Sequence, residues 1–192
     1  MPNYIDIELA GYSFRLFAER CLYWPAQRIL FVADTHLGKE ATFTRGGIPV
    51  PLGSTQGTLK TIEEVLRKTD AKCLYVLGDL FHAKSSLSSP VRNCVESFLA
   101  DFPGLQFNLV RGNHDAHVGR LPAHWPIETI DPGVQIQGIA LGHHPSALPE
   151  GASLYFCGHL HPAIHVGFQN DSLGRQPCFW HSDGCMVLPA IG

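Results

Sequence analysis

Five short segments of this sequence place aspartate, asparagine and histidine residues where predicted strands end. In chain order they are Asp34-Thr35-His36, Gly78-Asp79, Gly112-Asn113-His114-Asp115, Gly142-His143-His144 and Gly158-His159-Leu160-His161. Carboxylates, imidazoles and amide oxygens are common ligands of divalent metal ions. The carboxyl ends of strands are also where α/β sheets place their chemistry. One such segment could arise by chance, but five in succession indicate a site for two metal ions.

Strand geometry predicts which of these side chains point to the same place. Asp34 and His36 are separated by one residue, so in an extended segment they share a face and can bind one ion. His144 directly follows His143, so its side chain is expected to face away, and His143 is the favoured ligand. The glycines at these turns are expected to let the backbone bend sharply, which points the next side chain into a shared cleft.

Apolar runs and helical periodicity alternate along the chain. Buried strands are predicted at residues 29–33, 73–77 and 106–110, and helices packed on a sheet at 58–69 and 89–102, an order typical of a parallel sheet. Short antiparallel strands are predicted within residues 4–24, and residues 38–57 are expected to form a loop that walls the site. After Pro126 only short strands are predicted, at 127–130, 134–137, 139–141, 154–157, 164–168, 178–181 and 186–188. At this length, residues 1–192 are expected to form a single domain.

Composition excludes several classes of protein. Apolar residues make up 45% and charged residues 16% of the chain, which is typical of a globular protein rather than a disordered one. No membrane span or secretory leader is recognisable, so a soluble cytoplasmic protein without a membrane partner is expected. The six cysteines lack Cys-x-x-Cys spacing and are expected to be reduced core residues. The net charge of −3 argues against a protein that coats duplex DNA.

Together the five motifs resemble those of the calcineurin-like metallophosphoesterase superfamily, over nearly the whole chain. The resemblance implies an α/β fold, a four-layer α-β-β-α sandwich of two mixed β-sheets that holds two divalent ions. It implies seven ligands: Asp34, His36 and His161 for one ion, Asn113, His143 and His159 for the other, and Asp79 between them. Because all seven offer nitrogen or oxygen, Mn²⁺ is the expected metal, with Mg²⁺, Fe²⁺, Zn²⁺ and Ni²⁺ as alternatives.

The implied chemistry is hydrolysis of a phosphate ester. Two ions can hold a hydroxide between them for attack on phosphorus. The superfamily gives His114 the task of neutralising the leaving oxygen. Asp115 is a second catalytic candidate, which either orients His114 or only caps the turn. His82, three residues after Asp79, either lines the substrate pocket or packs as a neutral core histidine.

The loop after the first motif narrows the resemblance. Residues 33–53, with 78–82 and 187–192, look like the ligase-associated DNA-damage-response phosphoesterases, often encoded beside a DNA ligase and a helicase. Lys39 and Arg45 in this loop could bind substrate phosphates, or the loop could be a solvated segment stiffened by its prolines. Relatives usually have Phe where Ile191 stands and continue into a Gly-rich tail.

The sequence therefore predicts a metal-dependent phosphodiesterase or nuclease that serves DNA repair. Its expected substrates are single-stranded DNA, nucleic-acid ends or cyclic nucleotides, because the acidic balance suits these better than long duplexes. A general phosphomonoesterase is the alternative, since the same site supports both reactions. A non-catalytic scaffold of the same fold is a further alternative, disfavoured because His114 and all seven ligands are present.

Overall fold

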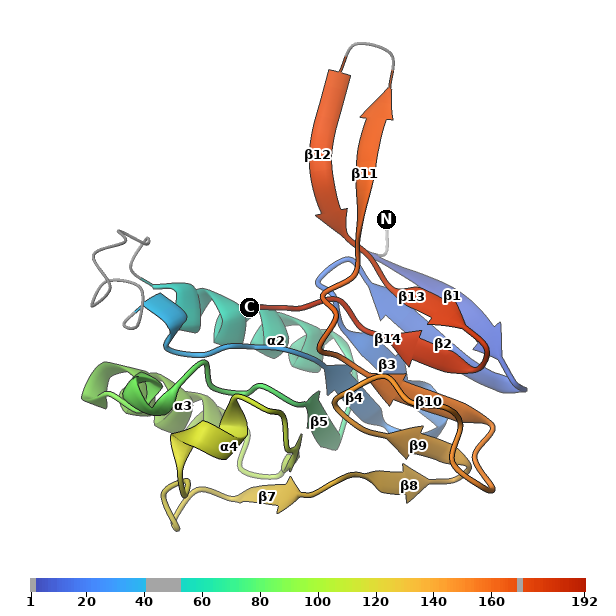
Figure 1. The fold of residues 1–192 in the computed structure, drawn as a ribbon. Coiled ribbons are helices and arrows are strands. Elements are labelled where there is room, and N and C mark those ends of the chain that lie inside the picture. The colour runs from blue at the N-terminus through green and yellow to red at the C-terminus, as the bar shows by residue number, and fades with distance from the viewer. Residues whose placement is uncertain (1–2, 41–52, 169–170) are drawn as a thin grey trace.

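A seven-stranded mixed sheet forms the centre of the protein (Figure 1). The computed structural model describes residues 3–40, 53–168 and 171–192. The strands of this sheet lie in chain order: β1 (Tyr4–Leu9), β2 (Tyr12–Phe17), β3 (Leu22–Trp24), β4 (Ile29–Val32), β5 (Cys73–Leu77), β6 (Gln106–Val110) and β7 (Ile127–Ile130). Strands β1 to β4 pair antiparallel and β4 to β7 pair parallel. The antiparallel start and the parallel continuation are both as the sequence predicts.

The helices connect the parallel strands. They are α2 (Ser54–Lys68), α3 (Ser89–Asp101) and the short α4 (Asp115–Val118), with 3₁₀ turns η1 (Pro25–Gln27) and η2 (Lys84–Ser86). Helix α2 begins four residues before its predicted start at residue 58. The prediction missed the first turn, Ser-Thr-Gln-Gly, because these residues show no apolar periodicity. Thr55 in that turn is buried, and its hydroxyl accepts a hydrogen bond from the Gly38 N–H at 2.8 Å. In the described parts of the chain, no helix is long and apolar enough to span a membrane.

The second half of the chain forms a five-stranded sheet and a separate hairpin. The sheet order is β13 (Trp180–Ser182), β14 (Cys185–Val187), β10 (Leu154–Cys157), β9 (Ile139–Leu141) and β8 (Val134–Ile136). The hairpin of β11 (Ala163–Phe168) and β12 (Asp171–Pro177) projects away from the body of the molecule (Figure 1). Strand β12 was not predicted, because its sequence, Asp-Ser-Leu-Gly-Arg-Gln-Pro, has no apolar alternation.

Strand β4 shows how the layers are held together. Leu30 and Val32 pack in the apolar cluster that includes the inner faces of α2 and α3, whereas Ile29 and Phe31 pack in the cluster between the two sheets. All four side chains are buried. A strand covered on both faces reads as an uninterrupted apolar run, which is why the sequence identifies this one so clearly.

The fold class is confirmed as α/β with two mixed sheets packed face to face. Helices α2 and α3 cover the outer face of the seven-stranded sheet. On the outer face of the five-stranded sheet, Tyr155 and Cys157 of β10 pack with Ala140 and Val187 in a small cluster. No described helix follows α4 in the chain, so the outer layer on this side is not helical in the part that the structure describes.

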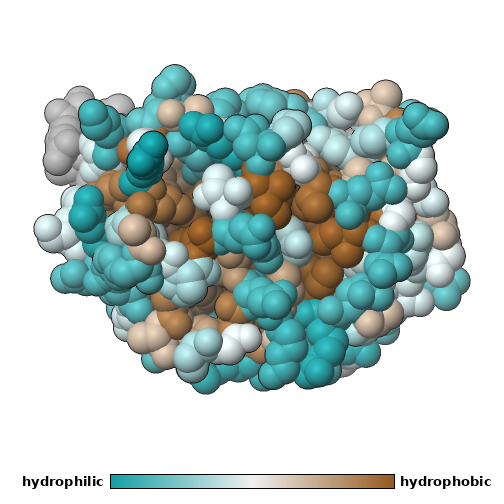
Figure 2. Space-filling model, turned by 90° about the horizontal axis from the view of Figure 1, so that it is seen from below, coloured by the Kyte–Doolittle hydropathy of each residue, from teal (hydrophilic) through white to brown (hydrophobic). Residues whose placement is uncertain are grey.

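Apolar residues also reach the surface on the face seen from below, where they lie between polar ones (Figure 2). A cavity of about 620 Å³ lies against β7 and α4 and is lined by apolar residues such as Leu109, Val118 and Trp125. Asp115 lines it too. The motif at residues 112–115 therefore borders this cavity.

Candidate metal centre

The five motifs meet at one edge of the two packed sheets. Strands β4, β5 and β6 are parallel neighbours, as are β9 and β10, so each group ends at a common edge. Seven predicted ligands follow these ends: Asp34 and His36 after β4, Asp79 after β5, Asn113 after β6, His143 after β9, and His159 and His161 after β10. A hydrogen bond of 2.9 Å from the His159 N–H to Oδ2 of Asp34 joins the two groups.

Five of these seven residues have a left-handed backbone. Their φ angles are 51° at Asp34, 44° at His36, 52° at Asp79, 68° at His159 and 47° at His161. This conformation costs an L-residue about 1–2 kcal/mol, and such strain gathers at functional sites. The expectation that Asp34 and His36 share the face of an extended segment is therefore wrong. Their N–H groups instead donate to the carbonyls of Gly78 and Asp79, at 3.2 and 2.9 Å, which fixes this turn on the end of β5.

Glycines are required here mainly because the predicted ligands pack directly on the backbone. Gly78 has a φ of +85° and confirms the expected sharp bend, and a Cβ on it would lie 2.0 Å from Nδ1 of His143. Gly112 and Gly158 do not have positive φ angles. A Cβ on them would lie 2.3 Å from Oδ1 of Asp79 and 2.5 Å from Oδ2 of Asp34, respectively. Any larger residue would displace a candidate ligand.

The first cluster is built around Asp34, which is completely buried. Its Oδ1 atom lies 3.5 Å from Nε2 of His161 and has no hydrogen-bond partner in the described structure. Nε2 of His36 lies 3.4 Å from Nε2 of His161. The ligand atoms of these three residues all lie within 4.8 Å of one another. A buried carboxylate oxygen without a partner is costly, and a divalent cation between these atoms would satisfy it.

The second cluster brings together His143, Asn113 and Asp79. Nδ1 of His143 lies 3.0 Å from the carbonyl oxygen of Leu77, which can only accept, so this nitrogen carries the proton. In the neutral ring, Nε2 is then an acceptor, yet it faces Oδ1 of Asn113 at 3.0 Å and Oδ2 of Asp79 at 3.4 Å. Three acceptors that face one another fit a shared cation.

The protonation states of His36 and Asp79 suit metal binding, which requires neutral imidazoles and ionised carboxylates. Burial lowers the pKa of His36 to about 4, against the opposing influence of the carboxylates of Asp34 and Asp79, so the ring is neutral at pH 7. For Asp79, burial raises the pKa, but the contact with His143 and the hydrogen bond from the His114 N–H outweigh it and lower the pKa below its usual value. Asp79 is therefore ionised at neutral pH.

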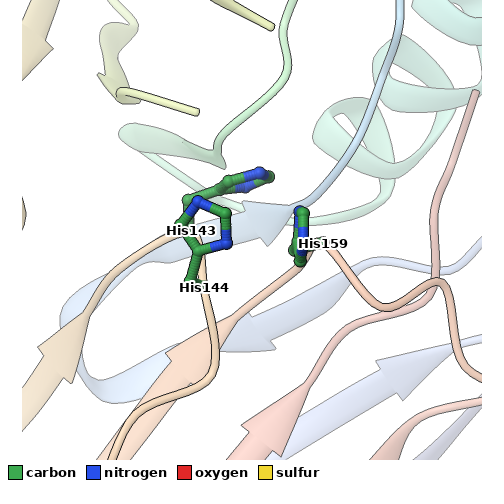
Figure 3. Close-up of side chains that lie close together, drawn as sticks. All are labelled: His143, His144 and His159. Atoms are coloured by element: carbon green, nitrogen blue, oxygen red, sulfur yellow. The ribbon is translucent and has the colours of Figure 1, made fainter. Parts of the chain in front are cut away.

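Strand alternation predicts that the side chain of His144 faces away from the site, and this prediction is wrong. Its ring centroid lies 4.7 Å from that of His143 and 4.2 Å from that of His159. Figure 3 shows the three imidazoles gathered above the ends of β9 and β10. The sequence signal was the His-His pair itself, and the assumption of an extended backbone at this turn concealed it.

His114 lies beside the predicted ligands. Its backbone N–H donates to Oδ1 of Asp79 at 2.9 Å, and its Nδ1 lies 2.6 Å from the carbonyl oxygen of His82. Its ring belongs to a group with His36 and Asp79 whose ligand atoms lie within 4.8 Å of one another. The Nδ1–H···O=C bond therefore orients the ring and leaves Nε2 available to the site.

Asp115 caps backbone groups. Its Oδ1 accepts the N–H of Phe81 at 3.2 Å and its Oδ2 accepts the N–H of Gly112 at 2.9 Å. No hydrogen bond joins its carboxylate to the ring of His114 within the described residues. Of the two alternatives for Asp115, these contacts favour the cap, which locks the turn that carries Asn113.

The predicted substrate-binding residues are only partly described. The ring of His82 stacks on that of His114, with centroids 5.2 Å apart and planes inclined by 21°. Burial, together with the positive charges of His114 and Lys39, lowers the pKa of His82, so half-buried Lys39 is near enough to act on it. Arg45 and most of the loop expected to wall the site, residues 41–52, lie outside the described residues.

The last residues of the sequence also support the site, a role that sequence reasoning missed. The N–H groups of Ile191 and Gly192 donate to the carbonyls of Ala33 and Asp34 at 3.1 and 3.2 Å. Ile191 is 8% exposed and packs in the core cluster beneath α2 and α3. The isoleucine that stands where relatives have phenylalanine therefore fills the core behind the first motif.

Comparisons with known proteins agree with this arrangement. Residues 27–139 match the model of the calcineurin-like phosphoesterase family. A nuclease, MPE, from Pseudomonas putida has a crystal structure that matches with a TM-score of 0.86 and 34% identity, over 99% of this chain and 88% of that one. A search of curated protein sequences found no match.

Two more solved structures match with lower TM-scores. A protein of unknown function from Aquifex aeolicus has a TM-score of 0.49 and 23% identity, over 69% of this chain and 78% of that one. The phosphoesterase Yfce from E. coli has a TM-score of 0.43 and 18% identity, over 85% of this chain and 79% of that one.

Proposed function

Because the chain belongs to the calcineurin-like phosphoesterase family of metal-dependent phosphoesterases, we propose that it is a phosphodiesterase that hydrolyses single-stranded nucleic acid or cyclic nucleotides. The observation that carries the proposal is that seven candidate metal ligands, each with an oxygen or nitrogen ligand atom, lie together at one sheet edge. Some of these atoms are buried without a hydrogen-bond partner in the described structure. The extensive match to a Pseudomonas putida nuclease supports a nucleic-acid substrate. The closer family resemblance suggests a role in DNA repair, beside a DNA ligase and a helicase.

The ligands divide between two ions. We assign Asp34, His36 and His161 to one ion, Asn113, His143 and His159 to the other, and Asp79 to both. The groupings of neighbouring ligand atoms support this division, and a group of Asp34, Asp79 and His143 links the two halves. The assigned set offers oxygen and nitrogen but no thiolate, which suits Mn²⁺.

The protein's own groups position the reacting phosphate and move a proton. When bound, the ions would activate a water molecule and neutralise charge on the phosphoryl oxygens. His114, whose ring is fixed through Nδ1–H, would in the form protonated on both nitrogens give the Nε2 proton to the oxygen that leaves and keep the proton on Nδ1. His82 stacks on that ring and Lys39 lies nearby, so both are placed to contact the flanking part of the substrate.

The decisive assay compares diester and monoester substrates with each metal. The rate of hydrolysis of bis-p-nitrophenyl phosphate and of p-nitrophenyl phosphate is measured with Mn²⁺, Mg²⁺, Zn²⁺ or Ni²⁺. The same measurement is then made with single-stranded DNA, duplex DNA and 2′,3′-cyclic nucleotides as substrates. We expect Mn²⁺-dependent diester hydrolysis and a preference for single strands or cyclic nucleotides over duplex. Asp79→Asn should remove activity and lower metal content together. Preference for the monoester, or equal activity of Asp79→Asn, would refute the proposal.

A further inference from the structure

His144 belongs to a cluster of three imidazoles, of which only His143 and His159 are assigned to an ion. The ligand nitrogens of His143, His144 and His159 all lie within 4.8 Å of one another. The ring planes of His144 and His159 are inclined by 64°, so the rings meet edge to face (Figure 3). In the described structure, no hydrogen bond involves the ring of either residue. Two exposed polar rings are thus packed together without a protein partner for their nitrogens.

The backbone of His144 is held in place by buried groups. Tyr155, which is 7% exposed, donates its hydroxyl to the carbonyl oxygen of His144 at 2.7 Å. Gly142 makes room for that hydroxyl, because a Cβ on residue 142 would lie 1.8 Å from it. The carbonyl of the preceding residue, His143, accepts the Gly158 N–H at 3.1 Å. These contacts fix the turn that presents the ring of His144 beside that of His159.

We propose that His144 is a further ligand of the ion assigned to Asn113, His143 and His159, and this inference depends on the two-ion centre proposed above. Three imidazole nitrogens that surround one point are a common protein site for a divalent ion. Oδ1 of Asn113 and Oδ2 of Asp79 lie 3.0 and 3.4 Å from Nε2 of His143. His144 is exposed and adds a third imidazole nitrogen within 4.8 Å of those of His143 and His159.

The added nitrogen makes the two ion sites chemically unequal. The site of Asp34, His36 and His161 has two imidazoles and a carboxylate, whereas the other would have three imidazoles. Imidazole favours Zn²⁺ and Ni²⁺ over Mn²⁺, following the general order of metal affinities. The site that includes His144 should therefore hold its ion more tightly and discriminate more strongly between Zn²⁺ and Mn²⁺.

Metal titration of His144→Ala tests the inference without relying on activity. The metal-free protein, residues 1–192, is titrated with Mn²⁺ and, separately, Zn²⁺ against a chromophoric chelator, and bound metal is measured by mass spectrometry after dialysis. We expect the metal affinity of one of the two binding steps to fall by at least roughly 10–100-fold. That is the loss found when a residue that hydrogen-bonds a metal ligand is removed, and removing a ligand itself should cost no less. The loss should be larger for Zn²⁺ than for Mn²⁺. Tyr155→Phe should weaken the same step less, since the ring remains but its backbone is released.

Three further variants make the outcomes distinguishable. His181→Ala removes an exposed imidazole from β13, away from the site, and should bind both metals as the wild type does. His143→Ala and His36→Ala should each weaken one step. If those two variants lose metal but His144→Ala binds like the wild type, the inference is overturned and the two-ion centre stands. Unchanged metal affinity with a raised KM would place His144 on the substrate and also overturn the inference. If His36→Ala, His143→Ala and His144→Ala all bind both ions normally, the two-ion centre itself is refuted.

Discussion

Replacing Gly78 with alanine tests how closely the candidate metal centre is packed. Gly78 has a φ of +85°, in the left-handed region. A Cβ there would lie 2.0 Å from Nδ1 and 2.4 Å from Cγ of His143, so the imidazole has to move. Moving it breaks the 3.0 Å hydrogen bond from Nδ1 to the carbonyl oxygen of Leu77. The substitution therefore combines backbone strain with displacement of one predicted ligand.

The expected loss can be assembled from these two parts. Left-handed alanine costs about 1–2 kcal/mol. A buried hydrogen bond broken on one side costs about 1–3 kcal/mol more, so the free energy of unfolding should fall by about 2–5 kcal/mol. For a chain of this size, each kcal/mol lowers Tm by roughly 2–4 °C. Because the Leu77 contact orients His143, we also expect metal affinity to fall by about 10–100-fold.

Gly11→Ala is the matched control. Gly11, in the turn between β1 and β2, has a φ of +82°, and a Cβ on it would meet no atom within 4 Å. It should show the strain alone, about 1–2 kcal/mol, with unchanged metal affinity. Urea denaturation of the metal-free proteins measures stability, and Mn²⁺ titration measures affinity. If Gly78→Ala loses no more stability than Gly11→Ala and binds Mn²⁺ equally well, then the ring of His143 does not pack on Gly78 and the geometry of this centre is wrong.

Three shorter predictions concern other parts of the molecule. His114→Ala should reduce kcat by about 10²-fold or more while mass spectrometry shows unchanged metal content; a normal kcat would remove its proposed role. Asp115→Ala leaves the N–H groups of Gly112 and Phe81 without an acceptor, so urea denaturation should show a loss of about 2–4 kcal/mol, and an unchanged midpoint would contradict the cap. Cys21 is completely buried, and burial raises the pKa of its thiol, so iodoacetamide at pH 8 should modify it only after unfolding; peptide mass spectrometry of native, alkylated protein would reveal an exception.

The secondary structure was predictable where a residue pattern is compatible with only one structural environment. Strand β4 lies between two apolar clusters, so its four residues had to be apolar, and the sequence shows this directly. The start of α2 at Ser54 and the whole of β12 could not be read in the same way. Their residues are largely polar because they pack little apolar surface, and periodicity carries no signal without it.

The directions of the side chains depended on backbone conformations that a sequence does not display. Asp34 and His36 converge through two left-handed residues held on the end of β5, not through strand alternation. The same assumption of an extended backbone led to the wrong prediction that the side chain of His144 faces away from the site. In the structure its ring centroid lies 4.2 Å from that of His159. Hydrogen bonds from distant strands stabilise these local conformations, so they follow from the assembled fold rather than from neighbouring residues.

By itself, the sequence determined which chemical groups stand at strand ends, because metal ligands must be particular residue types and buried strands must be apolar. It thereby determined the family and the type of reaction. Only the tertiary structure decided how the groups face one another: which oxygens are buried without partners, that Asp115 caps a turn, and that His144 joins His143 and His159. The physical reason is that each of these arrangements is fixed by contacts between segments far apart in the chain, and their distances exist only after the two sheets have packed.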